Sequence, residues 1–127
     1  MTRWKGSIMP LIRGSARGDF GGLSPQWEAP ASLCVVLAAG GYPGSYEKGK
    51  PIRGLEQASA LPGVTVFHAG TALEGNQVVT SGGRVLSVTA IGETIDEAAE
   101  RAYAAAAMIE FEGKQFRRDI GWRARSR

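Results

Sequence analysis

The run Leu33–Lys50, LCVVLAAGGYPGSYEKGK, decides the fold of this 127-residue chain. Its first part, Leu33–Ala39, is continuously apolar, which predicts a β-strand buried on both faces or nearly so. The loop Gly40–Arg53 follows and gathers tyrosine, proline, glycine, glutamate and lysine within a few positions. Backbone rich in glycine lets an anionic group approach the peptide N–H groups closely. The run therefore predicts a buried strand that leads directly into a binding loop.

Three later segments have the β-branched and apolar content of strands: Val64–His68, Gln77–Thr80 and Arg84–Ile91. Gly75-Asn76 is a predicted turn before the second of them. Gly82-Gly83 separates the last two segments and resembles a two-residue hairpin connection between them. Strands followed by one strong helix are typical of a small antiparallel α+β domain, which is the fold class that we expect.

The main helix begins at the capping box Thr94-Ile-Asp-Glu97 and is expected to end at about Ile109. The Thr94 hydroxyl can accept a hydrogen bond from the Glu97 amide, and the Glu97 side chain can reach back. The residues of the apolar stripe are mostly alanine, which lets a helix lie close to a sheet: Ile95, Ala98, Ala99, Ala102, Ala106 and Ile109.

The other segments give weaker signals. Ser7–Ala16 has weak helical periodicity, and Gly18–Pro30 is a predicted connector anchored by Trp27. Leu55–Leu61 is predicted to form a helical turn or loop. The tail Gln115–Arg127 carries apolar residues between its charges, so we expect it to dock on the domain.

Composition narrows the class of protein. The chain is 43% hydrophobic with a net charge of +3, and one cysteine excludes an internal disulfide and a multi-cysteine metal site. Cys34 lies in the apolar run and is predicted to be a buried, inert thiol. No apolar stretch reaches the roughly 20 residues that span a bilayer, and no continuous signal-peptide core is present. We expect a cytoplasmic protein with no membrane partner.

The segment Gly44-x4-Gly49-Lys50 matches most of a phosphate-binding P-loop. The motif then requires serine or threonine, but Pro51 follows and supplies neither a hydroxyl nor an amide hydrogen. A Walker motif is therefore excluded. Two interpretations remain: Lys48 and Lys50 approach a phosphate, or the segment is an ordinary surface loop with solvated lysines.

The remaining chemistry-bearing residues are sparse. His68 is the only histidine, and a hydrogen-bonded structural role is more typical of such a residue than catalysis. No cluster of histidine, cysteine and carboxylate predicts a metal site. The arginine-rich tail lacks the aromatic pattern of an RNA-binding module, so we expect no nucleic-acid partner.

Several segments, in this order, resemble phosphoribosylamine–glycine ligase, also called glycinamide ribonucleotide synthetase: VVLAAGGYPGSYEKGKPI, VFHAGT, QVVTSGGRVLSVTAIGET, EAAERAYAA and FRRDIGWRA. The resemblance covers about Leu33–Arg125, and IMPLIRGSARGDFGGLSPQW (Ile8–Trp27) is similar to the family's lead-in to this region. It implies that residues 1–28 end an ATP-grasp part and that residues 29–127 form the C-terminal domain, a β-rich unit likened to a rudimentary single-hybrid motif.

The resemblance also implies an activity. The family uses ATP with Mg²⁺ or Mn²⁺ to join glycine to 5-phosphoribosylamine, in the second step of de novo purine synthesis. The ATP and metal ligands lie upstream, in a stretch like FGDPETQ that residues 1–127 lack. The chain is therefore expected to be inactive alone. Biotin or lipoyl carriage, which a hybrid motif also suggests, is disfavoured because none of its lysines adjoins a methionine: Lys5, Lys48, Lys50 and Lys114.

The resemblance implies no catalytic or metal-binding residue in this chain, but it does imply a set that binds substrate: Tyr42, Lys48, Gly49, His68, Gly70, Thr71, Gly83 and Arg84. Lys48, His68 and Arg84 are expected to face the ribose phosphate or the cleft, positioning substrate and stabilising charge. The alternative is a non-catalytic module that completes a separate ATP-grasp half in trans. Its contact patch would consist of Ile8, Met9, Leu11 and Ile12.

Overall fold

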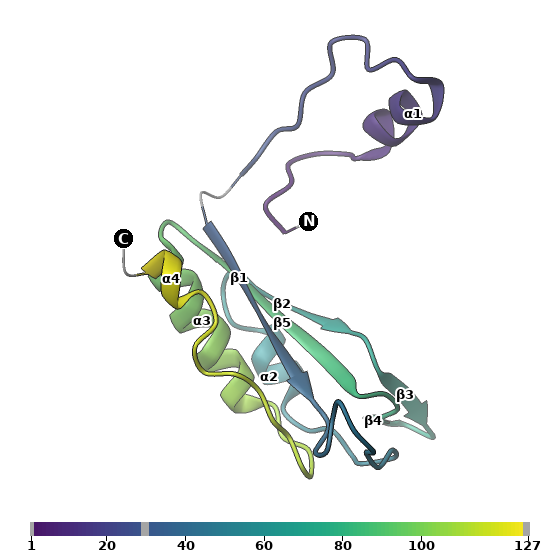
Figure 1. Ribbon diagram of the computed structural model, residues 1–127, viewed down its shortest axis with the longest axis vertical. Helices are drawn as coiled ribbons and strands as arrows, with labels where there is room; N and C mark the ends of the chain where they lie inside the picture. Colours follow the sequence, from purple (N-terminus) through teal and green to yellow (C-terminus); the bar gives the residue numbers. More distant parts are fainter. Residues whose placement is uncertain (1, 29–30, 126–127) are drawn as a thin grey trace.

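The computed structural model describes residues 2–28 and 31–125. The elements, in chain order, are α1 (Met9–Arg17), β1 (Ala31–Ala38), α2 (Leu55–Ser59), β2 (Val64–His68), β3 (Thr71–Glu74), β4 (Gln77–Thr80), β5 (Arg84–Gly92), α3 (Ile95–Met108) and α4 (Trp122–Arg125). Antiparallel sheets with one long packed helix confirm the α+β class (Figure 1). None of the helices in the described residues is long and apolar enough to cross a bilayer.

The main sheet has the strand order β1-β5-β2, and both pairings are antiparallel. Val88 of the central strand lies opposite Val35 of β1 and Val66 of β2. The inner face is apolar along its length, and α3 covers it (Figure 1). The core therefore lies mainly between one sheet face and α3, and α2 adds Ala58 to it.

Helix α3 begins where the sequence predicts. The Thr94 Oγ1 accepts a hydrogen bond from the Glu97 backbone N–H at 3.2 Å. The Glu97 carboxylate reaches back to the N–H of Glu93, at 2.7 Å, rather than to that of Thr94. Five alanines of this helix are fully buried against the core: Ala98, Ala99, Ala102, Ala105 and Ala106.

The prediction of two-sided burial for the first strand is wrong. Along β1, buried Leu33, Val35 and Leu37 alternate with exposed Cys34 and Val36. Helix α3 covers only the inner face, so the opposite face remains open. For the same reason, the prediction that Cys34 is a buried thiol is also wrong, since this side chain is exposed.

The predicted hairpin across Gly82-Gly83 is also wrong. Strand β4 pairs with β3, a strand that the sequence did not predict, around the turn Gly75-Asn76. A Cβ added at Gly70 would lie 2.7 Å from the Gly82 Cα, so two glycine backbones touch at the base of this β3–β4 hairpin. The chain then enters β5 in the centre of the other sheet.

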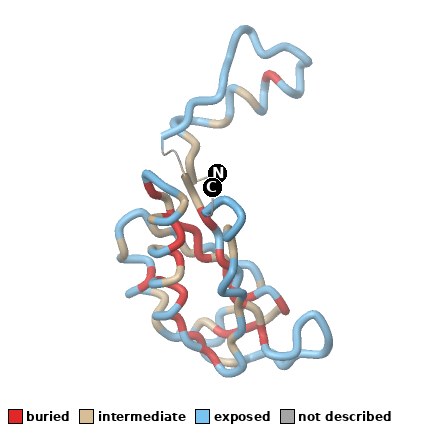
Figure 2. The backbone as a smooth tube through the Cα atoms, turned by 60° about the vertical axis from the view of Figure 1, so that its left-hand side comes forward, coloured by how far each residue is buried: buried red, intermediate tan, exposed pale blue. Residues whose placement is uncertain are grey.

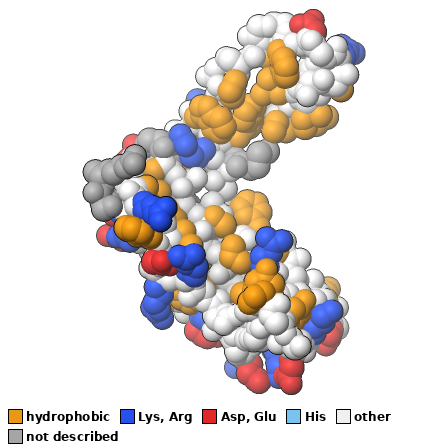
Figure 3. Space-filling model, viewed as in Figure 1, with side chains coloured by type: hydrophobic (Ala, Val, Ile, Leu, Met, Phe, Trp, Pro, Cys, Tyr) orange, Lys and Arg blue, Asp and Glu red, His pale blue; other side chains and the backbone are white. Residues whose placement is uncertain are grey.

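Residues 2–28 form an N-terminal unit that stands apart from the sheet (Figure 2). Backbone hydrogen bonds from Lys5 to Gln26 (3.0 Å) and from Glu28 to Arg3 (2.9 Å) close this loop, and the Trp4 and Trp27 rings meet edge to face. Trp27 thus anchors its segment as expected, although 57% of it is exposed. Figure 3 shows hydrophobic side chains gathered along the lower edge of this unit.

The C-terminal tail docks on the domain, as expected. Phe116 and Ile120 pack against the hydrophobic core. The Tyr103 hydroxyl donates a hydrogen bond to the Arg117 carbonyl at 3.1 Å and accepts one from the Ile120 N–H at 3.0 Å. These contacts hold the tail along α3.

Removal of the helix cap should weaken the domain measurably. Thr94→Ala is expected to lower the free energy of unfolding by about 1 kcal/mol, because the Glu97 N–H loses its acceptor. Thr94→Ser keeps the hydroxyl and should retain most of the stability. Urea unfolding followed by circular dichroism measures both, and equal losses for the two variants would contradict this role.

The alanine face of α3 should not tolerate larger side chains. Ala102 is fully buried, so Ala102→Leu is expected to lower the free energy of unfolding by about 1–3 kcal/mol through overpacking. Ala104 is exposed on the same helix, and Ala104→Leu should change stability by less than about 0.5 kcal/mol. Thermal unfolding of the two variants would refute the close packing if both melted alike.

Candidate binding loops at one end of the sheet

The glycine-rich clusters that the sequence singled out meet at one end of the main sheet. Strands β1 and β2 end there and β5 begins there, because both run antiparallel to β5. The Ala39 N–H donates to the Gly83 carbonyl at 2.8 Å, and the Gly70 N–H donates to the Val85 carbonyl at 3.0 Å. Three segments that are far apart in the sequence are thus joined through their backbones.

Tyr42 and Tyr46 pack around Gly83. A Cβ added at Gly83 would lie 2.2 Å from the Tyr42 Cδ2 and 3.0 Å from the Tyr46 Cε1, so a side chain here would displace both rings. The two rings meet edge to face with centroids 6.3 Å apart. Both tyrosines remain more than one-third exposed, which leaves their rings accessible beside the backbone of β5.

Gln115 holds the start of the loop in place. Its side-chain amide donates to the carbonyls of Ala39 at 3.0 Å and Tyr42 at 2.9 Å. Its backbone also exchanges two hydrogen bonds with Ala38. Sequence reasoning missed Gln115, because no local pattern connects two residues that lie 73 positions apart.

The second half of the loop pairs with the β3–β4 hairpin. The Gly49 N–H donates to the Thr80 carbonyl at 2.7 Å, and the Ile52 N–H donates to the Val78 carbonyl at 2.9 Å. The Lys50 N–H donates to the Thr80 Oγ1 at 3.0 Å. Lys48 and Gly49 therefore lie beside the end of β4.

Lys50 does not offer a free charge to an anion. Its ammonium group pairs with Glu47 at 2.7 Å and with Glu112 at 3.1 Å. The hydrogen bond that the Lys50 ammonium group donates to the Glu47 carboxylate is the main reason that the pKa of Lys50 is raised, and the same contact lowers the pKa of Glu47. Lys48 is exposed and has no hydrogen bond or ion pair within residues 2–28 and 31–125. Of the two loop lysines, Lys48 is the one available to a phosphate.

His68 and Thr71 contact each other at the turn from β2 into β3, where the His68 Nδ1 and the Thr71 Oγ1 are 2.9 Å apart. Arg84 lies exposed at the start of β5. Within the described residues, no hydrogen bond or ion pair joins Lys48, His68 and Arg84 to one another. The structure thus brings these three side chains to one end of the sheet without assembling them into a closed site.

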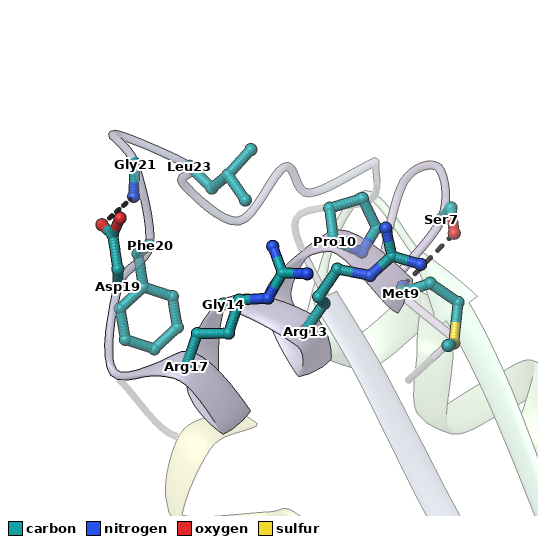
Figure 4. A pocket seen from close by; sticks show the side chains of 10 residues that line it. All are labelled: Ser7, Met9, Pro10, Arg13, Gly14, Arg17, Asp19, Phe20, Gly21 and Leu23. Carbon is teal, nitrogen blue, oxygen red and sulfur yellow. Dashed lines mark hydrogen bonds between the residues drawn. The ribbon is translucent and has the colours of Figure 1, made fainter.

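Two hollows lie away from the eight predicted residues. One, of about 160 Å³, lies behind the loop and is lined by Ala39, Gly40, Glu47, Lys50, Thr80, Glu112 and Gly113. The other, of about 550 Å³, lies on the N-terminal unit between α1 and the loop that follows it. Figure 4 shows Arg13 and Arg17 extending over this second hollow. Neither hollow contains any of the residues predicted to bind substrate.

The described residues hold no assembled metal site, and the lysine of the P-loop-like segment is already paired. They hold no group of three or more histidine, cysteine, aspartate or glutamate side chains that could bind a metal ion. The lysine of the P-loop-like segment is already neutralised by two carboxylates.

Comparison with known proteins gives one consistent result. The family described as "Phosphoribosylglycinamide synthetase, C domain" matches residues 32–123. A Rhizobium meliloti protein named phosphoribosylamine–glycine ligase is 47% identical over 127 residues, which are 100% of this chain and 30% of that protein. A chloroplastic protein of the same name from Arabidopsis thaliana is 50% identical over 98% of this chain and 24% of its own length.

The structural comparison agrees with the sequence comparison. The crystal structure of phosphoribosylamine–glycine ligase from Thermotoga maritima superposes with a TM-score of 0.73 at 37% identity. The superposition covers 88% of this chain and 27% of that one, so the chain spans less than a third of these relatives. The matched residues include nearly all of β1, the glycine-rich loops and α3. The chain therefore belongs to the phosphoribosylglycinamide synthetase C-domain family.

Proposed function

We propose that this chain is the C-terminal part of an ATP-dependent ligase that joins glycine to 5-phosphoribosylamine to give glycinamide ribonucleotide. The observation that carries this proposal is the family match over residues 32–123, together with relatives named phosphoribosylamine–glycine ligase. In such a reaction ATP activates the glycine carboxylate as an acyl phosphate, and the amine of phosphoribosylamine then attacks it. This would be the second step of purine synthesis.

The chain would supply only part of that enzyme. ATP and Mg²⁺ or Mn²⁺ would be bound by the ATP-grasp part, since the described residues hold no group of three or more side chains that could bind a metal ion. We assign residues 1–28 to the end of that part and residues 29–127 to the C-terminal domain. Cytoplasmic location also stays a prediction, and the name of the Arabidopsis relative carries the word "chloroplastic".

The role of the loops would be to bind and position substrate. Lys48 and Arg84 are exposed cations without ion pairs in the described residues, and both lie at the loop end of the sheet. A phosphate of phosphoribosylamine would attract both side chains through charge-assisted hydrogen bonds. His68, already hydrogen-bonded to Thr71, would donate or accept at the edge of the same surface. Tyr42, Gly49, Gly70 and Gly83 would shape it.

A second candidate function is that of a non-catalytic module that completes a separate ATP-grasp half in trans. It is favoured by the apolar residues of the N-terminal unit, of which Met9 is 58% and Ile12 51% exposed. Ile8 and Leu11, from the same predicted patch, are half-buried. Both candidates place this chain against the same larger partner, and they differ in whether the two are covalently joined.

The isolated chain should be inactive, and a fusion should be active. The purified 127-residue chain is expected to form no ADP from ATP, glycine and phosphoribosylamine. The Rhizobium meliloti enzyme, with its matched 127 residues replaced by this chain, should form glycinamide ribonucleotide. Turnover by the chain alone would show that it is complete. An inactive but folded fusion would argue against the proposed function.

Loss of a loop cation should weaken substrate binding in the active fusion. Lys48→Ala and Arg84→Ala are each expected to raise the KM for phosphoribosylamine about tenfold or more, since a hydrogen bond to a charged group is worth roughly 1.5–3 kcal/mol. Lys5→Ala removes a similar exposed charge from the N-terminal unit and should leave KM unchanged. Steady-state kinetics decide, and unchanged KM values in both loop variants would remove these residues from the site.

A further inference from the structure

The outer face of the main sheet, opposite α3, carries eight uncharged residues: Ser32, Cys34 and Val36 of β1, Thr65 and Phe67 of β2, and Ser87, Thr89 and Ile91 of β5. The pairing register places Val36 and Phe67 on either side of Ser87, and Cys34 and Thr65 on either side of Thr89. These residues therefore form one continuous surface across the strands.

This outer face is exposed along both edge strands, although Thr89 in the centre is buried, and its polar groups are hydroxyls only, with no charged side chain. Phe67 is 44% and Val36 38% exposed, and Cys34 is also exposed. Antiparallel sheets that face water on one side carry polar and charged residues there. A face with a phenylalanine, a valine and a thiol but no charge is typical of a surface that another domain or protein covers.

The sequence of β1 supports the same conclusion. Its continuous apolar run has the composition of a strand buried on both faces, yet α3 buries only one face. The apolar composition of β1 and its one exposed face are both explained if another domain or protein covers the sheet on the side opposite α3. Burial of a side chain such as Phe67 would contribute roughly 1.5–3 kcal/mol to that contact.

The relatives suggest which domain could cover the outer face. This chain matches 30% of the Rhizobium protein and 27% of the Thermotoga one, so most of each relative lies outside the matched region. The N-terminal unit of this chain leaves Val36 and Phe67 exposed. We propose that the outer face is the surface on which the preceding part of the ligase packs, through an uncharged, apolar surface of its own. This inference rests on the proposed function.

Cys34 is a built-in reporter for this contact, because it is the only cysteine of the chain and lies on the outer face. In the isolated chain it should react readily with a maleimide. In the Rhizobium fusion its labelling should slow by at least about tenfold, since reaction then requires local opening of the interface. Peptide mass spectrometry distinguishes Cys34 from cysteines of the fusion partner.

A matched pair of variants tests the contact itself. Phe67→Lys places a charge on the outer face and should restore labelling of Cys34 in the fusion to the rate of the isolated chain. Leu73→Lys adds the same charge on β3, where the side chain is 69% exposed, and should leave Cys34 protected. Thermal unfolding of the isolated variants checks that neither change unfolds the domain.

The outcomes separate the two proposals. An active fusion in which Cys34 reacts at the isolated-chain rate would overturn the outer-face interface and leave the proposed function standing. An inactive fusion with protected Cys34, released by Phe67→Lys, would support the interface and contradict the function. Slow labelling of the isolated chain, with a dimeric mass by light scattering, would assign the face to a second copy of this chain and overturn the inference.

Discussion

The packing of the alanine face of α3 against β5 is the contact on which the rest of the structure depends. Alanine side chains are small, so the helix backbone lies close to the central strand and no cavity needs filling by longer groups. Strand β5 is held on both edges, by β1 and by β2, and on its inner face by α3. This fixes the direction of all three strands and therefore the end at which their connecting loops meet.

The loops themselves are shaped by contacts that tolerate almost no side-chain volume. Gly70 meets Gly82 backbone to backbone, and Gly83 makes room for Tyr42 and Tyr46. Gln115 then fixes the start of the loop through two carbonyl groups. The surface is thus preorganised by backbone geometry, while its exposed cations remain available. Preorganisation of this kind reduces the entropy lost when a ligand binds.

Local signals in the sequence were sufficient for most elements. The capping box at Thr94 marks the start of α3, and Val64–His68 coincides with β2. The partners of the strands were not predictable in the same way. Gly82-Gly83 looks like a hairpin turn, but β4 pairs with β3, because the contact between Gly70 and Gly82 redirects the chain. Such a contact joins residues that no local pattern relates.

The exposure of one face of β1 and the pairing of the loop lysines could not be predicted from the sequence either. The apolar content of β1 predicts burial of both its faces. It does not say whether the residues that cover the second face belong to the same 127 residues. Lys48 and Lys50 look alike in the sequence, and only the positions of Glu47 and Glu112 show that one of them is already paired. The role of the eight predicted binding residues remains a prediction. The structure adds that they lie at one end of the main sheet.

The two hydrogen bonds that the Gln115 side chain donates to the loop have a consequence for the order of events during synthesis. The ribosome adds Gln115 long after the loop it holds, since 73 positions separate it from Tyr42. Domains generally fold as units while the chain emerges. Before Gln115 is added, the Tyr42 carbonyl lacks this donor, whereas the Ala39 carbonyl can still accept from the Tyr42 N–H. The start of this glycine-rich loop can therefore take up its final position only after nearly the whole domain has been synthesised.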